Sequence, residues 1–295
     1  MEIVEGQSSV SFQPVFLVTS TNLMNNLDFT TAAADIAREA GSLLERYYDQ
    51  RVAVEYKGEF DLVTAADRAS EKLVVERLRS HFPSHSIVAE EGGGVEHDSG
   101  YVWFVDPLDG TTNFAHSFPV FAVSIGLQHN NELVAGVVYD PIRKELFSAE
   151  RGSGAYLNHR RLRVSLTAEL RAGLFGTGFA AANRSSEVNV HFFHSMSLLT
   201  HGVRCPGSAA LDLCFVAAGR LDGFWEFGLK PWDVAAGLVI VSEAGGTFCD
   251  MRGGPYELGG PHLAATNGRL QQDLLKVFAD VAEGRGVAPP PPASL

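Results

Sequence analysis

An apolar run that ends in two carboxylates constrains the fold of this chain more than any other stretch. Residues 102–105 predict a buried strand, which ends at Asp106 and Asp109 with a proline between them. Gly110 then frees the backbone, and the threonines after it can open a helix. Carboxylates beside the N–H groups of a helix start suit a hard cation next to an anion. The stretch therefore predicts a phosphate held against Mg²⁺.

Ordinary structural roles compete with this interpretation. Asp-Gly is a frequent turn, and an acidic residue before a helix is a frequent cap. An EF-hand loop is excluded, because the D-x-[DN]-x-[DN]-G pattern is not met and no glutamate stands at loop position twelve. The turn and the cap stay open for this stretch taken alone.

Two further acidic segments favour the metal–phosphate site. Residues 86–89 form a short apolar run that ends at Glu90 and Glu91, of which one can turn inward while the other is solvated. Asp233 falls in the first turn of a predicted helix, where the helix dipole favours negative charge. A buried carboxylate needs a cation or strong donors beside it. Three such segments in one chain are better explained by a shared cation than by three separate caps.

Composition narrows the class of protein. The formal net charge of −12 argues against a general nucleic-acid-binding surface. Bound Mg²⁺ would supply the local positive charge that an acidic protein needs to hold phosphate. No run of eighteen apolar residues predicts a membrane span. The cysteines form no C-x-x-C pair and predict a reducing, cytoplasmic location; they are Cys205, Cys214 and Cys249.

The hydrophobic pattern predicts an α/β protein with mixed strands. Helices are expected over 30–48, 64–82, 187–199, 209–218, 234–243 and 268–281. Strands are expected over 121–127, 133–139, 144–149, 221–227 and 262–265. The first three of these strands are separated by turn signals and should be successive antiparallel neighbours. A capping box, Thr64-Ala-Ala-Asp67, should open the second helix.

Several motifs taken together resemble the inositol monophosphatase family, and most closely its bacterial branch. The resemblance runs from about residue 29 to about residue 270. It is carried by Glu90-Glu91, Asp106-Pro-Leu-Asp109-Gly-Thr-Thr-Asn113, Trp232-Asp233-Val-Ala-Ala with Glu243-Ala-Gly-Gly246, Asp61-Leu-Val-Thr-Ala-Ala-Asp67, Phe118-Pro-Val-Phe-Ala-Val-Ser-Ile-Gly126, and Pro206-Gly-Ser-Ala-Ala-Leu-Asp212. It implies layered helices and sheets, an α-β-α-β-α sandwich of the sugar-phosphatase type.

The resemblance also implies an activity. A Mg²⁺-dependent phosphomonoesterase would hydrolyse inositol monophosphates to inositol and phosphate, with two to three Mg²⁺ ions per site and a water as the attacking group. It further implies inhibition by Li⁺ and a homodimer. The substrate would be a small phosphate ester bound between two halves of the domain.

Residue roles follow from the resemblance, position by position. The implied metal ligands are Glu90, Asp106, Asp109, Asp233 and the backbone carbonyl of Leu108. Glu90 and Thr111 would activate the water, supported by a polar cluster with Lys57 and Asp67. Apart from the resemblance, Lys57 fits a surface lysine and Asp67 a helix cap, and these alternatives stay open. The implied substrate contacts are Asp109, Gly110, Thr111, Gly207, Ser208, Ala209, Glu226 and Asp233.

Other functions remain as alternatives. A relative of the same fold could act on fructose 1,6-bisphosphate, histidinol phosphate or a nucleotide 3′-phosphate. Glu226 favours a polyol, because a carboxylate can accept hydrogen bonds from two ring hydroxyls. A regulatory protein that contacts the transcription or RNA machinery is an alternative of another class.

The chain divides into three parts. Residues 1–28 are expected to be an N-terminal extension, either non-native or disordered, with Met24 as a candidate functional start. Residues 29–284 should be one phosphatase domain in two intimate halves. The half over about 29–165 would carry most metal ligands, and the half over about 166–284 the substrate contacts and Asp233. Residues 285–295 are expected to be a disordered proline-rich tail.

Overall fold

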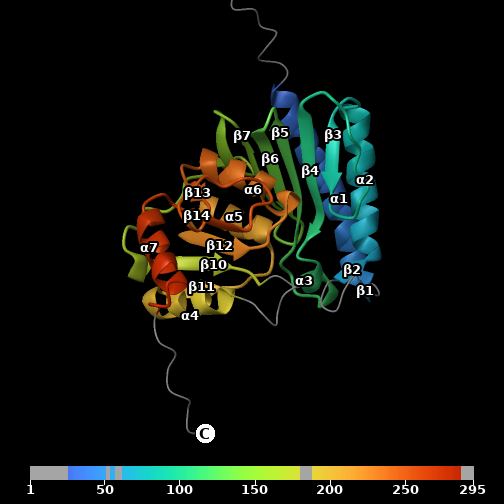
Figure 1. Cartoon of the computed structure of the whole chain (residues 1–295). Helices are drawn as coiled ribbons and strands as arrows, with labels where there is room; N and C mark the ends of the chain where they lie inside the picture. The colour runs from blue at the N-terminus through green and yellow to red at the C-terminus, as the bar shows by residue number, and fades with distance from the viewer. Residues whose placement is uncertain (1–25, 51–53, 57–61, 180–187, 287–295) are drawn as a thin grey trace, which may run out of the picture.

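Two sheets alternate with three layers of helices, in the order α-β-α-β-α (Figure 1). This arrangement confirms the predicted fold class. The structure is a computed structural model that describes residues 26–50, 54–56, 62–179 and 188–286. The predictions for residues 1–25, for the Met24 start, for Lys57 and for the tail from residue 287 lie outside the described residues.

The first layer consists of two long helices, α1 (Asn26–Gln50) and α2 (Ala65–His81). The capping box at the start of α2 is confirmed: the Thr64 N–H donates to the Asp67 carboxylate at 2.8 Å, and the Ala66 N–H donates to Thr64 Oγ1 at 3.1 Å. Just before α2 lies a short hairpin of β1 (Val54–Tyr56) and β2 (Leu62–Thr64).

A seven-stranded sheet packs against this first layer. Its strands follow one another in chain order, and all neighbours are antiparallel except the parallel pair β3 and β4. The predicted antiparallel run of three strands is therefore confirmed. The strands are β3 (Ser86–Ala89), β4 (Tyr101–Asp109), β5 (Ala122–His129), β6 (Glu132–Asp140), β7 (Glu145–Glu150), β8 (Gly154–Leu157) and β9 (Arg160–Arg161).

Strand β4 is longer than predicted. It continues through Asp106 to Asp109, with a shift in its pairing to β5 between those two residues. The irregular register bends the end of the strand, which then enters the short helix α3 (Thr111–Ala115). Both carboxylates therefore project from one distorted strand end.

The middle layer holds α5 (Ala209–Ala217) and α6 (Pro231–Glu243). Helix α6 lies directly on the first sheet, because Gly126 and Gly136 leave room for its backbone. A Cβ atom at Gly126 would lie 2.7 Å from the backbone nitrogen of Ala236. This close crossing fixes the first turn of α6, which carries Asp233, relative to the end of β4.

The second sheet has five strands in the order β11-β10-β12-β14-β13. It is mixed, with β10 parallel to β11 and β12 and the other pairs antiparallel. Trp225 and Phe175 on this sheet pack with Phe278 from the outer helices. The elements are β10 (Leu174–Thr177), β11 (Gly202–Arg204), β12 (Gly223–Phe227), β13 (Thr247–Cys249), β14 (His262–Thr266), α4 (Asn189–Leu199) and α7 (Gln271–Ala282).

The two sheets draw their strands from opposite sides of residue 165 in the chain. The predicted division into two halves near that residue stays a prediction. None of the helices in the described part of the chain combines the length and apolar character that a membrane span needs.

Candidate active site

A pocket of about 310 Å³ lies where the end of β4 meets the first turns of α5 and α6. It brings together nearly all of the residues predicted for the site, from segments up to 143 positions apart in the sequence. The predicted residues that line it are Glu90, Asp106, Leu108, Asp109, Gly110, Thr111, Gly207, Ser208, Ala209, Glu226 and Asp233. Of the two remaining predicted residues, Asp67 lies behind the pocket, and Lys57 is outside the described residues.

The loop after β4 is shaped by its own polar contacts. Asp106 is 3% exposed, and its Oδ1 accepts a hydrogen bond from the Leu108 N–H at 3.0 Å. Gly110 has a φ of +94°, a conformation that glycine adopts without strain. The Thr111 hydroxyl lies 2.9 Å from Asp67 Oδ1 and 3.1 Å from the Leu108 carbonyl oxygen. The loop is therefore tied to α2 through Thr111.

One face of α2 supports both acidic loops. Ser70 donates its hydroxyl to the Pro107 carbonyl at 2.8 Å. The buried Glu71 carboxylate accepts the N–H groups of Glu91 and Gly93 at 2.6 and 2.8 Å. Because residues three and four apart share a helix face, Asp67, Ser70 and Glu71 reach both loops from a single helix.

Glu90 and Glu91 differ from the prediction. Alternation along a strand predicted one inward and one solvated carboxylate, but both residues lie in the turn after β3 and both are half-buried. Strand alternation does not extend into a turn, which is the physical reason for the difference. Glu90 lines the pocket, whereas the backbone of Glu91 is held by Glu71.

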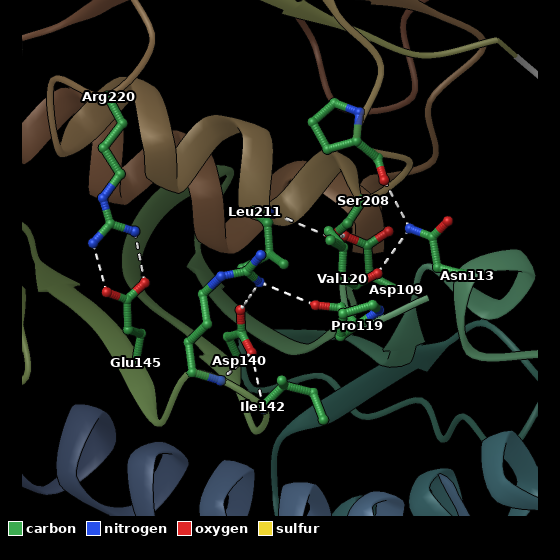
Figure 2. A network of polar contacts seen from close by, with 12 residues as sticks. Asp109, Asn113, Pro119, Val120, Asp140, Ile142, Glu145, Ser208, Leu211 and Arg220 are labelled. Carbon is green, nitrogen blue, oxygen red and sulfur yellow. Dashed lines mark hydrogen bonds and ion pairs between the residues drawn. The ribbon is translucent and has the colours of Figure 1, made fainter. Parts of the chain in front are cut away.

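Asp109 and Asp233 connect the pocket to the two middle helices. One Asp109 oxygen accepts the Ser208 hydroxyl at 2.5 Å and the Ala210 N–H at 2.8 Å, which places it at the start of α5 (Figure 2). Asp233 accepts the Lys230 N–H at 2.8 Å at the start of α6. Each carboxylate thus caps a helix and also lines the pocket.

Burial raises the pKa of three of the pocket carboxylates, and for Asp106 and Asp233 the charges of neighbouring carboxylates add to it. Burial, followed by the charges of Glu90, Asp109 and Asp233, raises the pKa of Asp106 well above its usual range. Burial raises the pKa of Asp109 to about 6 against the hydrogen bond from Ser208. Burial also raises the pKa of Asp233 to about 8, with smaller contributions from Asp109 and Glu90. No lysine or arginine is among the described residues that line the pocket.

This donor set fits a hard divalent cation. Oxygen-only ligands from carboxylates suit Mg²⁺, and a cation would offset the burial of negative charge that raises the pKa values of Asp106, Asp109 and Asp233. Among the described residues, no group of three or more His, Cys, Asp or Glu side chains has the arrangement of a ready-made ion site. That is compatible with Mg²⁺, which keeps several waters and is usually held by one or two carboxylates together with substrate phosphate.

The chain matches a sequence profile described as the inositol monophosphatase family over residues 25–283. It belongs to the inositol monophosphatase family. The resemblance read from the motifs is thereby confirmed, and members of this family are generally metal-dependent.

Individual relatives of this family member agree. An inositol-1-monophosphatase from Synechocystis is 44% identical over 270 residues, which cover 90% of this chain and 92% of the relative. A Nus factor SuhB from Pseudomonas aeruginosa is 45% identical over 249 residues, 81% of this chain and 91% of that protein. The structure of an inositol monophosphatase from Anabaena has a TM-score of 0.78 and 44% identity, covering 86% of this chain and 95% of that one.

Some pocket residues of this family member were not predicted. Asn113 and Asp212 stand inside the quoted motifs, but no role was assigned to them. Gly178 and Phe179 follow β10, a strand that the sequence did not indicate. Asp212 is 1% exposed, and within the described residues its Oδ1 has no hydrogen-bond partner. Burial, with the charges of Glu226 and Asp109, raises its pKa, which favours the neutral carboxyl.

Proposed function

We propose that this chain is a Mg²⁺-dependent phosphomonoesterase that hydrolyses inositol monophosphates to inositol and phosphate. One observation carries the proposal: carboxylates from three separate segments share one pocket with a glycine-opened helix start. The names of the Synechocystis and Anabaena relatives support inositol monophosphate as the substrate. The chain spans more than nine-tenths of each of these relatives, so the comparison concerns whole proteins.

Two to three Mg²⁺ ions are assigned to the acidic wall of the pocket, which is formed by Glu90, Asp106, Asp109 and Asp233. Glu90, Asp106, Asp109, Asp233 and the Leu108 carbonyl would hold them, because these are the oxygen donors that line the pocket. Bound there, Mg²⁺ would offset the charge of the phosphate oxygens and lower the pKa of a nearby water.

The phosphate is assigned to the start of α3. Gly110, with its positive φ, turns the chain from β4 into this helix, and the first N–H groups of a helix have no partner within it. The Gly110 and Thr111 N–H groups would therefore donate to phosphate oxygens at the wall where the carboxylates converge.

Thr111 and Glu90 are assigned to the attacking water. The Thr111 hydroxyl can donate to Asp67, which leaves the lone pairs of its oxygen to accept a hydrogen bond from water. Glu90 lines the same pocket and would accept a proton as the water attacks the phosphorus. Asp67 then acts through Thr111 rather than on the substrate. The role predicted for Lys57 in this cluster stays a prediction.

The alcohol side of the ester is assigned to the second half of the chain. Gly207, Ser208, Ala209 and Glu226 line the same pocket as the acidic residues. The Glu226 carboxylate lies against the backbone of Gly178, where a Cβ atom would collide with it. Glu226 is thus placed by a close backbone approach, and its two oxygens suit adjacent ring hydroxyls.

The proposal extends to a homodimer, a cytoplasmic location and inhibition by Li⁺. Exposed apolar side chains gather on and beside α4, which suits a homodimer contact; they are Val188, Val190, Leu198 and Leu199. The three free cysteines suit a reducing cytoplasm. Li⁺ is proposed as an inhibitor that competes for the cation site. A contact with transcription machinery is supported only by the names of relatives called Nus factor SuhB, among them the Pseudomonas protein.

A substrate panel tests the proposal. The purified full chain is assayed for phosphate release from inositol 1-phosphate, fructose 1,6-bisphosphate, histidinol phosphate and a nucleoside 3′-phosphate, with Mg²⁺ or with EDTA. We expect the highest kcat/KM for inositol 1-phosphate and no turnover in EDTA. A higher kcat/KM for another ester would make that ester the assigned substrate and keep the phosphatase assignment. Turnover in EDTA would refute the metal assignment.

A further inference from the structure

The side-chain amide of Asn113 joins three segments of the chain. Asn113 lies on α3, and its Nδ2 donates to the carbonyl oxygens of Val120 at 2.8 Å, Pro206 at 2.7 Å and Gly207 at 3.3 Å. Figure 2 shows the amide turned toward Val120 and the segment that leads to Ser208. The turn at Gly110 and Thr111, to which the phosphate is assigned, is called the phosphate loop here. One neutral donor group thus connects the phosphate loop with residues more than ninety positions further along the chain.

Two glycines make this junction unusually close. Gly110 and Gly207 have φ values of +94° and +82°. A Cβ atom on Gly110 would lie 2.9 Å from the Val120 oxygen and 3.2 Å from the Gly207 oxygen, and one on Gly207 would lie 3.0 Å from Asn113 Nδ2. No side chain fits between the segments, so the Asn113 amide is the donor toward which the three carbonyls converge.

The segment that Asn113 holds is the one assigned to the alcohol. Residues 207–209 line the pocket, and the amide donates hydrogen bonds to the carbonyl oxygens of residues 206 and 207. The other link at this place runs through Asp109, which bonds Ser208 and Ala210 but is also a proposed metal ligand. Asn113 is therefore the neutral link between the phosphate loop and the alcohol-binding segment.

We propose that Asn113 is a positioning residue that sets selectivity for the alcohol of the substrate by holding residues 206–208 against the phosphate loop. The inference rests on the proposed function. Without the amide, the three carbonyl oxygens lose their common donor and the segment shifts away from the loop. The phosphate, held by the acidic wall and α3, keeps its place, whereas the contacts to the alcohol loosen.

The fold should survive the loss of this amide. The two halves are also joined by Arg220 and Glu145, whose guanidinium and carboxylate form two hydrogen bonds at 2.6 and 2.5 Å (Figure 2). The buried cluster around α5 and α6 spans both sheets as well. A variant of Asn113 is therefore expected to fold and to be assayable.

The test compares Asn113→Ala and Asn113→Asp with the control Asn267→Ala. Asn267 is an equally polar bridge outside the pocket, 3% exposed, whose amide donates to Ser165 Oγ and the Thr167 carbonyl, both at 2.8 Å. The Asp variant keeps the size of the side chain but replaces the donor with an acceptor. KM and kcat are measured for inositol 1-phosphate and for 4-nitrophenyl phosphate, together with the melting temperature.

We expect both Asn113 variants to raise KM for inositol 1-phosphate about ten-fold or more, on the scale of one or two lost hydrogen bonds, with a change below about three-fold for 4-nitrophenyl phosphate. Asn267→Ala should lower the melting temperature and leave the ratio between the two substrates unchanged. An Asn113→Asp variant with wild-type KM for inositol 1-phosphate would overturn the proposal. Equal losses on both substrates in the Asn113 variants would overturn it as well. If the wild type itself does not prefer inositol 1-phosphate to the other sugar esters, the proposed function fails, and the Asn113 proposal is judged by the same KM ratio with the preferred ester.

Discussion

The Asp67 carboxylate accepts the Thr111 hydroxyl at 2.9 Å, across 44 residues of sequence. The other oxygen of the same carboxylate accepts both the N–H and the hydroxyl of Thr64 at the start of α2. The two interpretations of Asp67 that the sequence left open, a helix cap and a support for the site, therefore both describe contacts that it makes. One carboxylate fixes the start of a helix and the orientation of a pocket hydroxyl.

Asp67→Asn, compared with Thr64→Ala, tests which of these two contacts matters for activity. The amide can accept with only one atom, so Thr111 or Thr64 loses its acceptor, and we expect kcat to fall by about 10²-fold, the lower range for lost acid–base support. Thr64→Ala is the control: it removes the cap at a cost of about 1 kcal/mol of stability and leaves the Thr111 contact in place. Steady-state kinetics and melting curves check both variants. A kcat loss in Thr64→Ala as large as that in Asp67→Asn would show that helix stability alone is responsible.

Glu71→Gln should weaken cation binding through the loop that carries Glu90. The glutamine side chain has one acceptor oxygen for the two N–H groups that Glu71 now binds, so the loop loses an anchor. We expect the Mg²⁺ concentration for half-maximal activity to rise about 10- to 100-fold, as for other outer-shell supports. Glu76→Gln, on the exposed face of the same helix, should change nothing. A titration with unchanged Mg²⁺ dependence in Glu71→Gln would refute this role.

Stability should fall as pH rises in the absence of the cation, and Mg²⁺ should remove this dependence. The raised pKa values of Asp109, about 6, and Asp233, about 8, mean that the folded chain binds more protons than the unfolded chain above the usual carboxyl range. Without Mg²⁺, these groups therefore cost stability progressively as pH rises from about 4 to 8. Saturating Mg²⁺ removes this cost, so the gain in melting temperature between EDTA and Mg²⁺ should grow with pH. Thermal melts at several pH values check it, and a gain that stays constant or shrinks would contradict it.

Glu226→Gln tests the assignment of the alcohol contacts. An ionised acceptor of ring hydroxyls is worth roughly 1.5–3 kcal/mol, so kcat/KM for inositol 1-phosphate should fall about 10- to 100-fold. Hydrolysis of 4-nitrophenyl phosphate, which has no hydroxyls to contact, should hardly change. Equal losses on both substrates would move Glu226 from substrate selectivity to the structure or the metal site.

Local patterns made much of the fold predictable. The capping box at Thr64 fixed the start of α2 to within one residue, and the regular turns between β5, β6 and β7 predicted their antiparallel order. The short strands β10 and β11 were missed, because their parallel pairing depends on distant partners and leaves little pattern in four or three residues.

The residues of the candidate site were likewise predictable only in part. Asp106, Asp109 and Asp233 were predictable because each sits at a strand end or helix start with a recognisable local sequence. Asp212 lies in the first turn of α5, where acidic residues are common, and its burial depends on the packing of that turn against Gly176 and the pocket. The junction at Asn113 likewise exists only once two loops meet. Sequence patterns report the chemistry of a segment, whereas burial and close approach arise from tertiary packing.

Asp106→Asn tests the central claim, a cation-dependent hydrolase built on shared carboxylates, most directly. The substitution keeps the shape of a residue that is 3% exposed but removes its charge from the pocket. Phosphate release from inositol 1-phosphate at saturating Mg²⁺ should fall by at least about 10²-fold, the scale of losing a key electrostatic stabiliser. Asp273→Asn, on the exposed first turn of α7, serves as the control and should keep full activity. Near-normal turnover in a folded Asp106→Asn variant would contradict the account.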